Sequence, residues 1–239
     1  MSKKKPLSKI LGVGHTKGGV GKSTIAVNFA VVAASLGLKV LLADLDPVQR
    51  SSSKWAGVRR QLQDSGEELL SIRCVSMEGK GVHRDLLEVG EDYDLIVADA
   101  GGFDSVALRG LLVVADVLLM PANVSAFEMW EFGRMQELIE QANGFRVNDG
   151  DLPAWVLLNQ VGVTGGAKEA REAREFLAED GFQALGKVIH SRKAFRRGAE
   201  IGLSVLEQRG RAKDEKAILE MTEAFRDVAV NVLSLELPR

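Results

Sequence analysis

The chain has 239 residues, of which 46% are apolar and 27% charged, ordinary values for a soluble globular protein. Its formal net charge of −2 excludes a molecule that is basic as a whole, so any contact with nucleic acid would need a local basic patch. The single cysteine, Cys74, excludes a disulfide framework and a cysteine-ligated metal or iron–sulfur cluster. There is no apolar signal-peptide core and no run of about 18 apolar residues, so we expect a cytoplasmic protein that does not span a membrane.

Short apolar runs alternate with amphipathic stretches along the chain. This pattern predicts βα units and a mainly parallel, twisted α/β sheet with helices on both faces. The expected strands are 10–14, 39–43, 70–75, 95–98, 117–120, 155–158 and 185–189. The expected helices are 22–36, 51–63, 82–89, 125–142, 168–179 and 213–233. Because the pattern resumes after the polar loop 143–153, we expect one domain over 9–239 that follows a short basic tail, 1–8.

A glycine-rich loop lies between the first expected strand and the first expected helix. It reads Thr16-Lys17-Gly18-Gly19-Val20-Gly21-Lys22-Ser23-Thr24, with Thr16 where the usual phosphate-binding pattern has its first glycine. Glycines let backbone N–H groups converge on phosphate, and the helix that follows directs its positive end at the same anion. Lys22 is placed to reach the β- and γ-phosphates of a nucleotide, and the Ser23 hydroxyl to bind Mg²⁺. The sequence therefore predicts a P-loop NTPase.

A second lysine in this loop, Lys17, gives it a more specific character. With the pattern Lys-Gly-Gly-x-Gly-Lys-Ser, the chain resembles the ParA/MinD family of deviant Walker ATPases. The resemblance implies that Lys17 reaches across an ATP-dependent homodimer to the partner's nucleotide and stabilises developing charge there. It also implies that ATP and Mg²⁺ are the ligands of the site.

Carboxylates follow two of the expected strands. Asp99 ends an apolar run and matches the Walker B position, where a carboxylate holds Mg²⁺, usually through water. The segment Asp44-Leu-Asp46-Pro resembles the family's Asp-x-Asp-Pro-Gln, which implies that Asp44 lies near Mg²⁺ and that Asp46 activates the attacking water. Gln49 is displaced by one residue from the family's glutamine, which leaves its role open. Residues 100–102 are expected to sense the γ-phosphate, and Asp104 either caps the following helix or takes part in the chemistry.

One residue of the sixth expected strand matches the family pattern on its own. Asn159, at the strand's end, fits the asparagine that lies beside adenine in this family, and the alternative is an ordinary strand-end turn residue.

Family branches can be separated by what this chain contains. One cysteine excludes the iron-protein branch, and the C-terminal segment 224–239 lacks the basic amphipathic helix with which MinD-type proteins bind membranes. About fifteen residues precede the loop, so we expect no N-terminal helix-turn-helix domain. The chain is most similar to short, ParF-like ParA proteins. That resemblance implies partition of plasmid or chromosome cargo, non-specific DNA binding, nucleoid association, and a centromere-binding adaptor that stimulates hydrolysis.

A local basic cluster is the candidate for DNA contact. Four cations lie within six positions, and on a helix they would pair at spacing i, i+4 to form one stripe: Arg192, Lys193, Arg196 and Arg197. Arg209, Arg211 and Lys213 could extend it. A solvated helix face, or a place for Arg192 near the nucleotide, are the alternatives. At the level of function, a non-DNA cargo, a membrane-bound regulator and a small-molecule ligase stay open.

Overall fold

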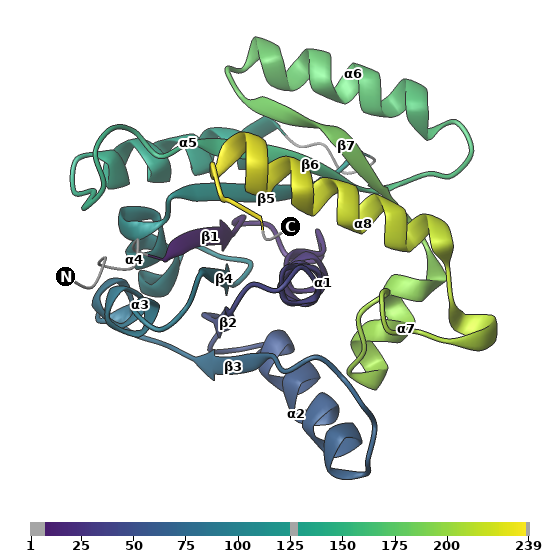
Figure 1. Ribbon diagram of the computed structural model, residues 1–239. Coiled ribbons are helices and arrows are strands. Elements are labelled where there is room, and N and C mark those ends of the chain that lie inside the picture. Colours follow the sequence, from purple (N-terminus) through teal and green to yellow (C-terminus); the bar gives the residue numbers. More distant parts are fainter. Residues whose placement is uncertain (1–7, 125–128, 238–239) are drawn as a thin grey trace.

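The computed structural model describes residues 8–124 and 129–237. Within these residues a single sheet of seven strands runs through the domain, and every hydrogen-bonded pair of neighbouring strands is parallel (Figure 1). The strand order is β3-β2-β4-β1-β5-β6-β7. The strands are β1 (Lys9–Val13), β2 (Val40–Asp44), β3 (Arg73–Ser76), β4 (Leu95–Asp99), β5 (Val117–Asn123), β6 (Ala154–Val161) and β7 (Gln183–His190). The predicted α/β class is confirmed.

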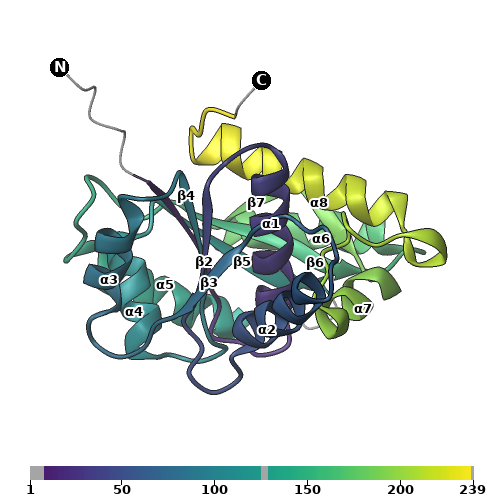
Figure 2. The same cartoon turned by 60° about the horizontal axis from the view of Figure 1, so that its bottom comes forward.

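Helices cover both faces of the sheet (Figures 1 and 2). One face carries α1 (Lys22–Ser35), α2 (Ser51–Asp64), α7 (Lys193–Ile201) and α8 (Glu215–Asp227). The other carries α3 (Val82–Gly90), α4 (Val106–Val114), α5 (Met129–Asn143) and α6 (Gly166–Glu179). The central strands β2 and β4 are buried at every position, because apolar helices pack on each side of them. Their carboxyl ends therefore open at one edge, where the connecting loops gather.

Several predicted boundaries differ from the observed ones. The third strand has only four residues, because 70–72 precede it without pairing. The last helix begins at Glu215, since Asp214 caps it by accepting hydrogen bonds from the backbone N–H groups of Lys216 and Ala217. After Asp227 it continues as a π-helical turn, Val228–Val232. The predicted helix 125–142 is described only from Met129, and its first residues lie outside the described part.

The hydroxyl of Ser8, the one described residue of the predicted tail 1–8, lies within hydrogen-bonding reach of the carbonyl oxygens of Gly90 and Tyr93. Among the described helices, none is both long and apolar enough to cross a membrane.

Candidate functional site

The glycine-rich loop joins β1 to α1 and ends at the first turn of that helix. Gly19 and Gly21 have positive φ angles of 77° and 92°, which side-chain-bearing residues rarely adopt. Gly21 precedes Lys22 at the start of α1, so the helix's first N–H groups open toward the loop. The ammonium of the buried Lys22 donates to the carbonyl oxygen of Lys17 across 2.6 Å, which folds the loop around it. This arrangement has the features of a phosphate cradle.

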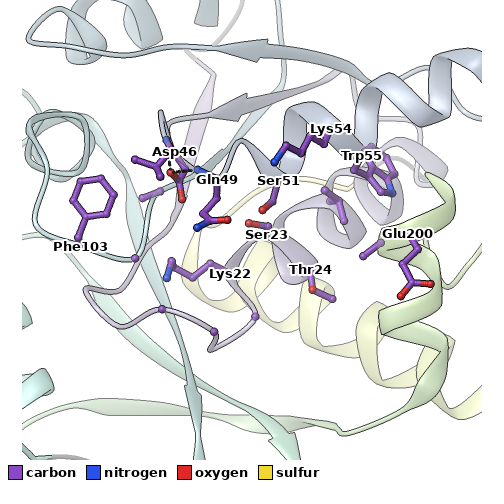
Figure 3. A pocket seen from close by; sticks show the side chains of 18 of the residues that line it. Lys22, Ser23, Thr24, Asp46, Gln49, Ser51, Lys54, Trp55, Phe103 and Glu200 are labelled. Carbon is purple, nitrogen blue, oxygen red and sulfur yellow. Dashed lines mark hydrogen bonds between the residues drawn. The ribbon is translucent and has the colours of Figure 1, made fainter.

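An open cavity of about 880 Å³ lies in front of this loop (Figure 3). Figure 3 shows Lys22, Ser23 and Thr24 on one side and Asp46 and Gln49 facing them. Further lining residues come from α2, the segment after β4 and α7: Ser51, Lys54, Trp55, Val58, Ala100, Gly102, Phe103, Ala199 and Glu200. Lys17 is half-buried and is not among the residues that line the cavity.

The two strand-end carboxylates, Asp44 and Asp99, are register partners on adjacent strands and are both fully buried. Asp44 uses both oxygens, because Oδ1 accepts from the backbone N–H of Asp46 and Oδ2 from that of Ser53. Asp99 Oδ2 accepts from the hydroxyl of Ser52 across 2.7 Å. Asp44 therefore orients the segment that carries Asp46 and the first turn of α2.

Asp99 keeps one oxygen, Oδ1, buried and without a hydrogen-bond partner in the described structure. The pKa of Asp99 is raised to about 7, chiefly by burial and also by the charge of Asp44, while the nearby hydroxyls of Ser52 and Ser23 oppose the rise. A buried oxygen of this kind next to the Ser23 hydroxyl fits a hard divalent cation. No group of three His, Cys, Asp or Glu residues in the described ranges could bind a metal by itself. A cation held here by Ser23 and Asp99 would thus take further ligands from phosphate and water, as Mg²⁺ does.

Asp46 lies at the mouth of the cavity and is almost buried. Its Oδ1 accepts from the backbone N–H groups of Val48 and Gln49, both at 2.9 Å, which fixes the turn that follows. Val48, the residue between Pro47 and Gln49, is 68% exposed and lies in the turn before α2. The turn still brings the Gln49 side chain to the cavity (Figure 3).

The segment after β4 packs closely against the phosphate loop. A Cβ at Gly102 would lie 2.9 Å from the Gly18 Cα and 3.2 Å from the Lys22 Nζ, so only glycine fits. Asp104 does not cap α4: Ser105 does, by accepting from the backbone N–H of Leu108. Asp104 instead receives two hydrogen bonds from Arg109, at 2.8 and 2.9 Å, and these lower its pKa.

The predicted adenine-side residue, Asn159, also lies at the loop. Its Nδ2 donates to the carbonyl oxygen of Val20 across 2.8 Å, and its side chain is buried. It does not line the cavity described above.

Sequence reasoning missed three residues that contact this site: His15, Ser52 and Gln160. His15 is buried and its Nδ1 accepts from the backbone N–H of Lys17. Its burial, together with the charges of Lys22 and Lys17, lowers its pKa to about 4. The signals in the sequence were a histidine directly before the phosphate-loop motif, a run of serines after the Asp-x-Asp-Pro segment, and a second amide beside Asn159.

The basic cluster differs from the predicted stripe. Arg192 has an extended backbone just before α7, so its predicted i, i+4 pairing with Arg196 on a helix is wrong. Its guanidinium forms an ion pair with Glu220 at 2.5 Å and lies 3.9 Å from Asp214. Lys213 pairs with Glu215. The other five cations of segments 192–201 and 209–213 are exposed and form no ion pair with the described residues: Lys193, Arg196, Arg197, Arg209 and Arg211. Gln208 links the two segments by donating to the carbonyl oxygen of Ala194.

Comparison with known proteins gives a consistent picture. Residues 11–205 match the family described as the CobQ/CobB/MinD/ParA nucleotide binding domain. Maintenance of carboxysome distribution protein A from Gloeobacter kilaueensis is 34% identical over 204 residues, which cover 85% of this chain and 86% of that protein. Chromosome-partitioning ATPase Soj from Thermus thermophilus is 47% identical over 141 residues, 50% of this chain and 56% of that protein. The ATP complex of a Cyanothece McdA variant has a similar fold, with a TM-score of 0.72 at 15% identity over 97% of this chain and 98% of that one.

Proposed function

Because the chain belongs to the MinD/ParA family of nucleotide-binding domains, we propose that it is an ATP-switched segregation protein whose ATP-bound homodimer holds non-specific DNA. The chain is an ATPase with ATP and Mg²⁺ as its ligands. In the proposal, a small centromere-binding adaptor stimulates hydrolysis, and release from DNA then moves a plasmid or chromosome cargo, as in ParF-like proteins. The protein would therefore be associated with the nucleoid in the cytoplasm.

The proposed roles of the site residues follow from their positions. Residues 18–24 hold the phosphates, with the Lys22 ammonium on the β- and γ-phosphates. Ser23 and Asp99 hold Mg²⁺, with Asp44 fixing the adjacent segment; bound there, Mg²⁺ would neutralise phosphate charge. Asp46 orients the attacking water, because its carboxylate lines the cavity on the side that faces Lys22 (Figure 3).

Lys17 is proposed to act on the partner's nucleotide rather than its own. Its absence from the cavity lining supports this, as do the exposed apolar side chains of Val48 and Phe103, which line the cavity. Sizing of Asp46→Ala protein with ATP tests the dimer. We expect the dimer with Asp46→Ala alone and a monomer when Lys17→Ala is added. A monomer under both conditions would contradict the proposal.

The observation that carries the DNA-binding part is the unpaired basic surface on α7 and the loop after it. Lys193, Arg196 and Arg197 fall at spacings of three and four on α7, so they lie along one side of the helix. Arg209 and Arg211 are on the segment that Gln208 ties to α7. Several phosphates neutralised in this way, twice in a dimer, would give salt-sensitive binding without sequence preference.

The test is Arg196→Glu with Arg197→Glu, measured by fluorescence anisotropy on duplex DNA with ATP. We expect binding to weaken at every sequence, and the slope of log affinity against log salt to fall by roughly two per protomer. Lys168→Glu with Arg171→Glu is the matched control. It changes the charge equally on α6, where both cations are exposed and lie across the sheet from α7. If the two double variants bind DNA with the same affinity and the same salt dependence, the assignment of DNA binding to the basic surface on α7 is wrong.

A second cargo class is supported by two relatives whose names refer to carboxysome distribution and which align over most of both chains. In that alternative the same ATPase would position a protein compartment over DNA. The two cargoes are separated by whether the neighbouring reading frame encodes a centromere-binding protein or a compartment-binding one. Liposome co-sedimentation and a search for a phosphorylated product test the membrane and ligase alternatives.

A further inference from the structure

The end of β6 has an irregular backbone next to the phosphate loop. Gln160 has a φ of 56°, a left-handed conformation that is uncommon for a residue with a side chain. The pairing of β6 with β7 shifts register on both sides of Leu158, between Val156 and Leu158 and between Leu158 and Val161. Such outliers persist where the surroundings fix them, and they gather at functional sites.

The irregularity changes where two consecutive side chains lie. In a regular strand, successive side chains point to opposite faces, so Asn159 and Gln160 would diverge. Here both reach the phosphate loop. Asn159 Nδ2 donates to the Val20 carbonyl oxygen at 2.8 Å, and Gln160 Nε2 donates to the Gly19 carbonyl oxygen at 3.1 Å.

These contacts orient two peptide groups of the loop. A trans peptide is planar, so its N–H points opposite to its C=O. The Gly19 and Val20 carbonyls point at the amides, and the N–H groups of Val20 and Gly21 must therefore point the other way, into the loop. Inward N–H groups are what a phosphate cradle requires.

Gln160 is itself held in place from the next strand. Asn123, at the end of β5, donates from Nδ2 to the Gln160 Oε1 at 3.2 Å. The Gln160 amide is thus oriented with its nitrogen toward Gly19, and it also lines the nucleotide cavity. Asn159 lies so close to the loop that a Cβ at Gly21 would come within 2.2 Å of its Nδ2, so this contact requires glycine at position 21.

We propose that Gln160 and Asn159 are positioning residues for phosphate binding: an amide pair that fixes the N–H groups of Val20 and Gly21 toward the nucleotide. The proposal rests on the assignment of residues 18–24 as the phosphate loop. It gives Asn159 a role that is independent of the base, and it gives Gln160 a role that requires its strained backbone.

The experiment uses the full-length protein with inorganic pyrophosphate, ADP and GDP as probes, titrated by calorimetry. Gln160→Gly removes the amide and suits the positive φ, so it separates the loss of the hydrogen bond from backbone strain. We expect pyrophosphate and ADP to bind roughly three- to tenfold more weakly, the range that one hydrogen bond supplies. The melting temperature without ligand should stay equal or rise.

Asn159→Ala is expected to lower the affinity for pyrophosphate and for ADP by factors similar to those of Gln160→Gly. The ratio of ADP affinity to GDP affinity should stay unchanged. Ser234→Gly is the control, because Ser234 also has a positive φ, of 52°, near the C-terminus and away from the cavity. It should leave every affinity at the wild-type value.

Unchanged pyrophosphate affinity in Gln160→Gly would overturn the proposal. So would an Asn159→Ala variant that alters only the ADP to GDP ratio, because that result assigns Asn159 to the base. Wild-type protein that binds neither ADP nor pyrophosphate would overturn the phosphate-loop assignment and the amide pair with it.

Discussion

Ser52 donates a hydrogen bond from its hydroxyl to Asp99 Oδ2 across 2.7 Å, and this contact joins the first turn of α2 to the end of β4. Both residues are fully buried, so water does not compete for the bond. With Oδ2 occupied, Asp99 Oδ1 is the oxygen left for a cation or its water ligand. Ser52 thereby sets which face of the carboxylate is available.

The first prediction concerns the Mg²⁺ requirement. Ser52→Ala should raise the Mg²⁺ concentration that gives half-maximal ATP hydrolysis by roughly tenfold, because outer contacts of this kind commonly contribute that much to metal affinity. The rate at saturating Mg²⁺ should change less. A Mg²⁺ titration of steady-state ATPase activity measures both quantities. Ser53→Ala, one residue along the helix, is the control, and an identical shift in the two variants would contradict a specific role for Ser52.

The second prediction concerns the buried ion pair of Arg59 with Glu207. Arg59 is 1% exposed, donates to both carboxylate oxygens at 2.8 and 2.6 Å, and donates to the Leu70 carbonyl oxygen. Arg59→Met leaves the Glu207 carboxylate, whose side chain is only 11% exposed, without its counter-ion, which costs about 3–5 kcal/mol. Denaturant unfolding should show this loss.

The double variant Arg59→Met with Glu207→Gln is the companion measurement. It removes both charges, so we expect it to be more stable than Arg59→Met alone. If the two variants are equally stable, the loss in Arg59→Met comes from packing and not from the unpaired charge.

The third prediction follows from the pKa of His15, which is lowered from 6.5 to about 4, mainly by burial. Between these values the unfolded chain binds a proton that the folded protein does not. Stability is therefore unaffected above pH 6.5 and is lost as the pH falls below it, by about 2 kcal/mol at pH 5. The raised pKa of Asp99 has the opposite effect on stability: as the pH falls through the same range, the folded protein binds a proton at Asp99 and gains stability.

The measurement must therefore compare two proteins that share Asp99. The difference in unfolding free energy between nucleotide-free wild type and His15→Gln should shift by about 2 kcal/mol in favour of His15→Gln between about pH 7 and pH 5. A difference that does not change with pH would mean that His15 has the same pKa in the folded and unfolded states, and would contradict the lowered pKa.

The parts of the site that could be predicted are those that depend on local order along the chain. The loop at 16–24 and the carboxylates Asp44 and Asp99 follow from a strand, its end and the start of the next element. Ser52 was not predictable, because its contact with Asp99 spans 47 residues and depends on how α2 packs. The same applies to Arg192, which a helical spacing places on a DNA-binding stripe but whose charge is taken by Glu220, 28 residues away.

Backbone irregularity limited the prediction in another way. Strand periodicity places Gln160 on the face opposite to Asn159, and no residue type in the sequence announces that Gln160 takes a positive φ. The fold class is insensitive to such details because the alternation of buried strands and amphipathic helices determines it.

The last prediction tests the close packing of Gly102 on the phosphate loop. Gly102→Ala would place a Cβ 2.9 Å from the Gly18 Cα, a backbone atom that cannot move without moving the loop. We expect weaker binding of ADP and ATP and slower hydrolysis, with a smaller effect on global stability, because the strain falls on loops and not on the core. Calorimetric titration with ADP and a melting curve measure the two effects separately.

Gly57→Ala is the matched control. Gly57 lies inside α2, and no atom lies within 4 Å of the Cβ that this substitution adds. The variant should therefore be more stable than wild type by about 0.5–1 kcal/mol and should bind ADP with unchanged affinity. Equal ADP affinity in Gly102→Ala and wild type would show that the segment after β4 yields freely and does not shape the phosphate loop.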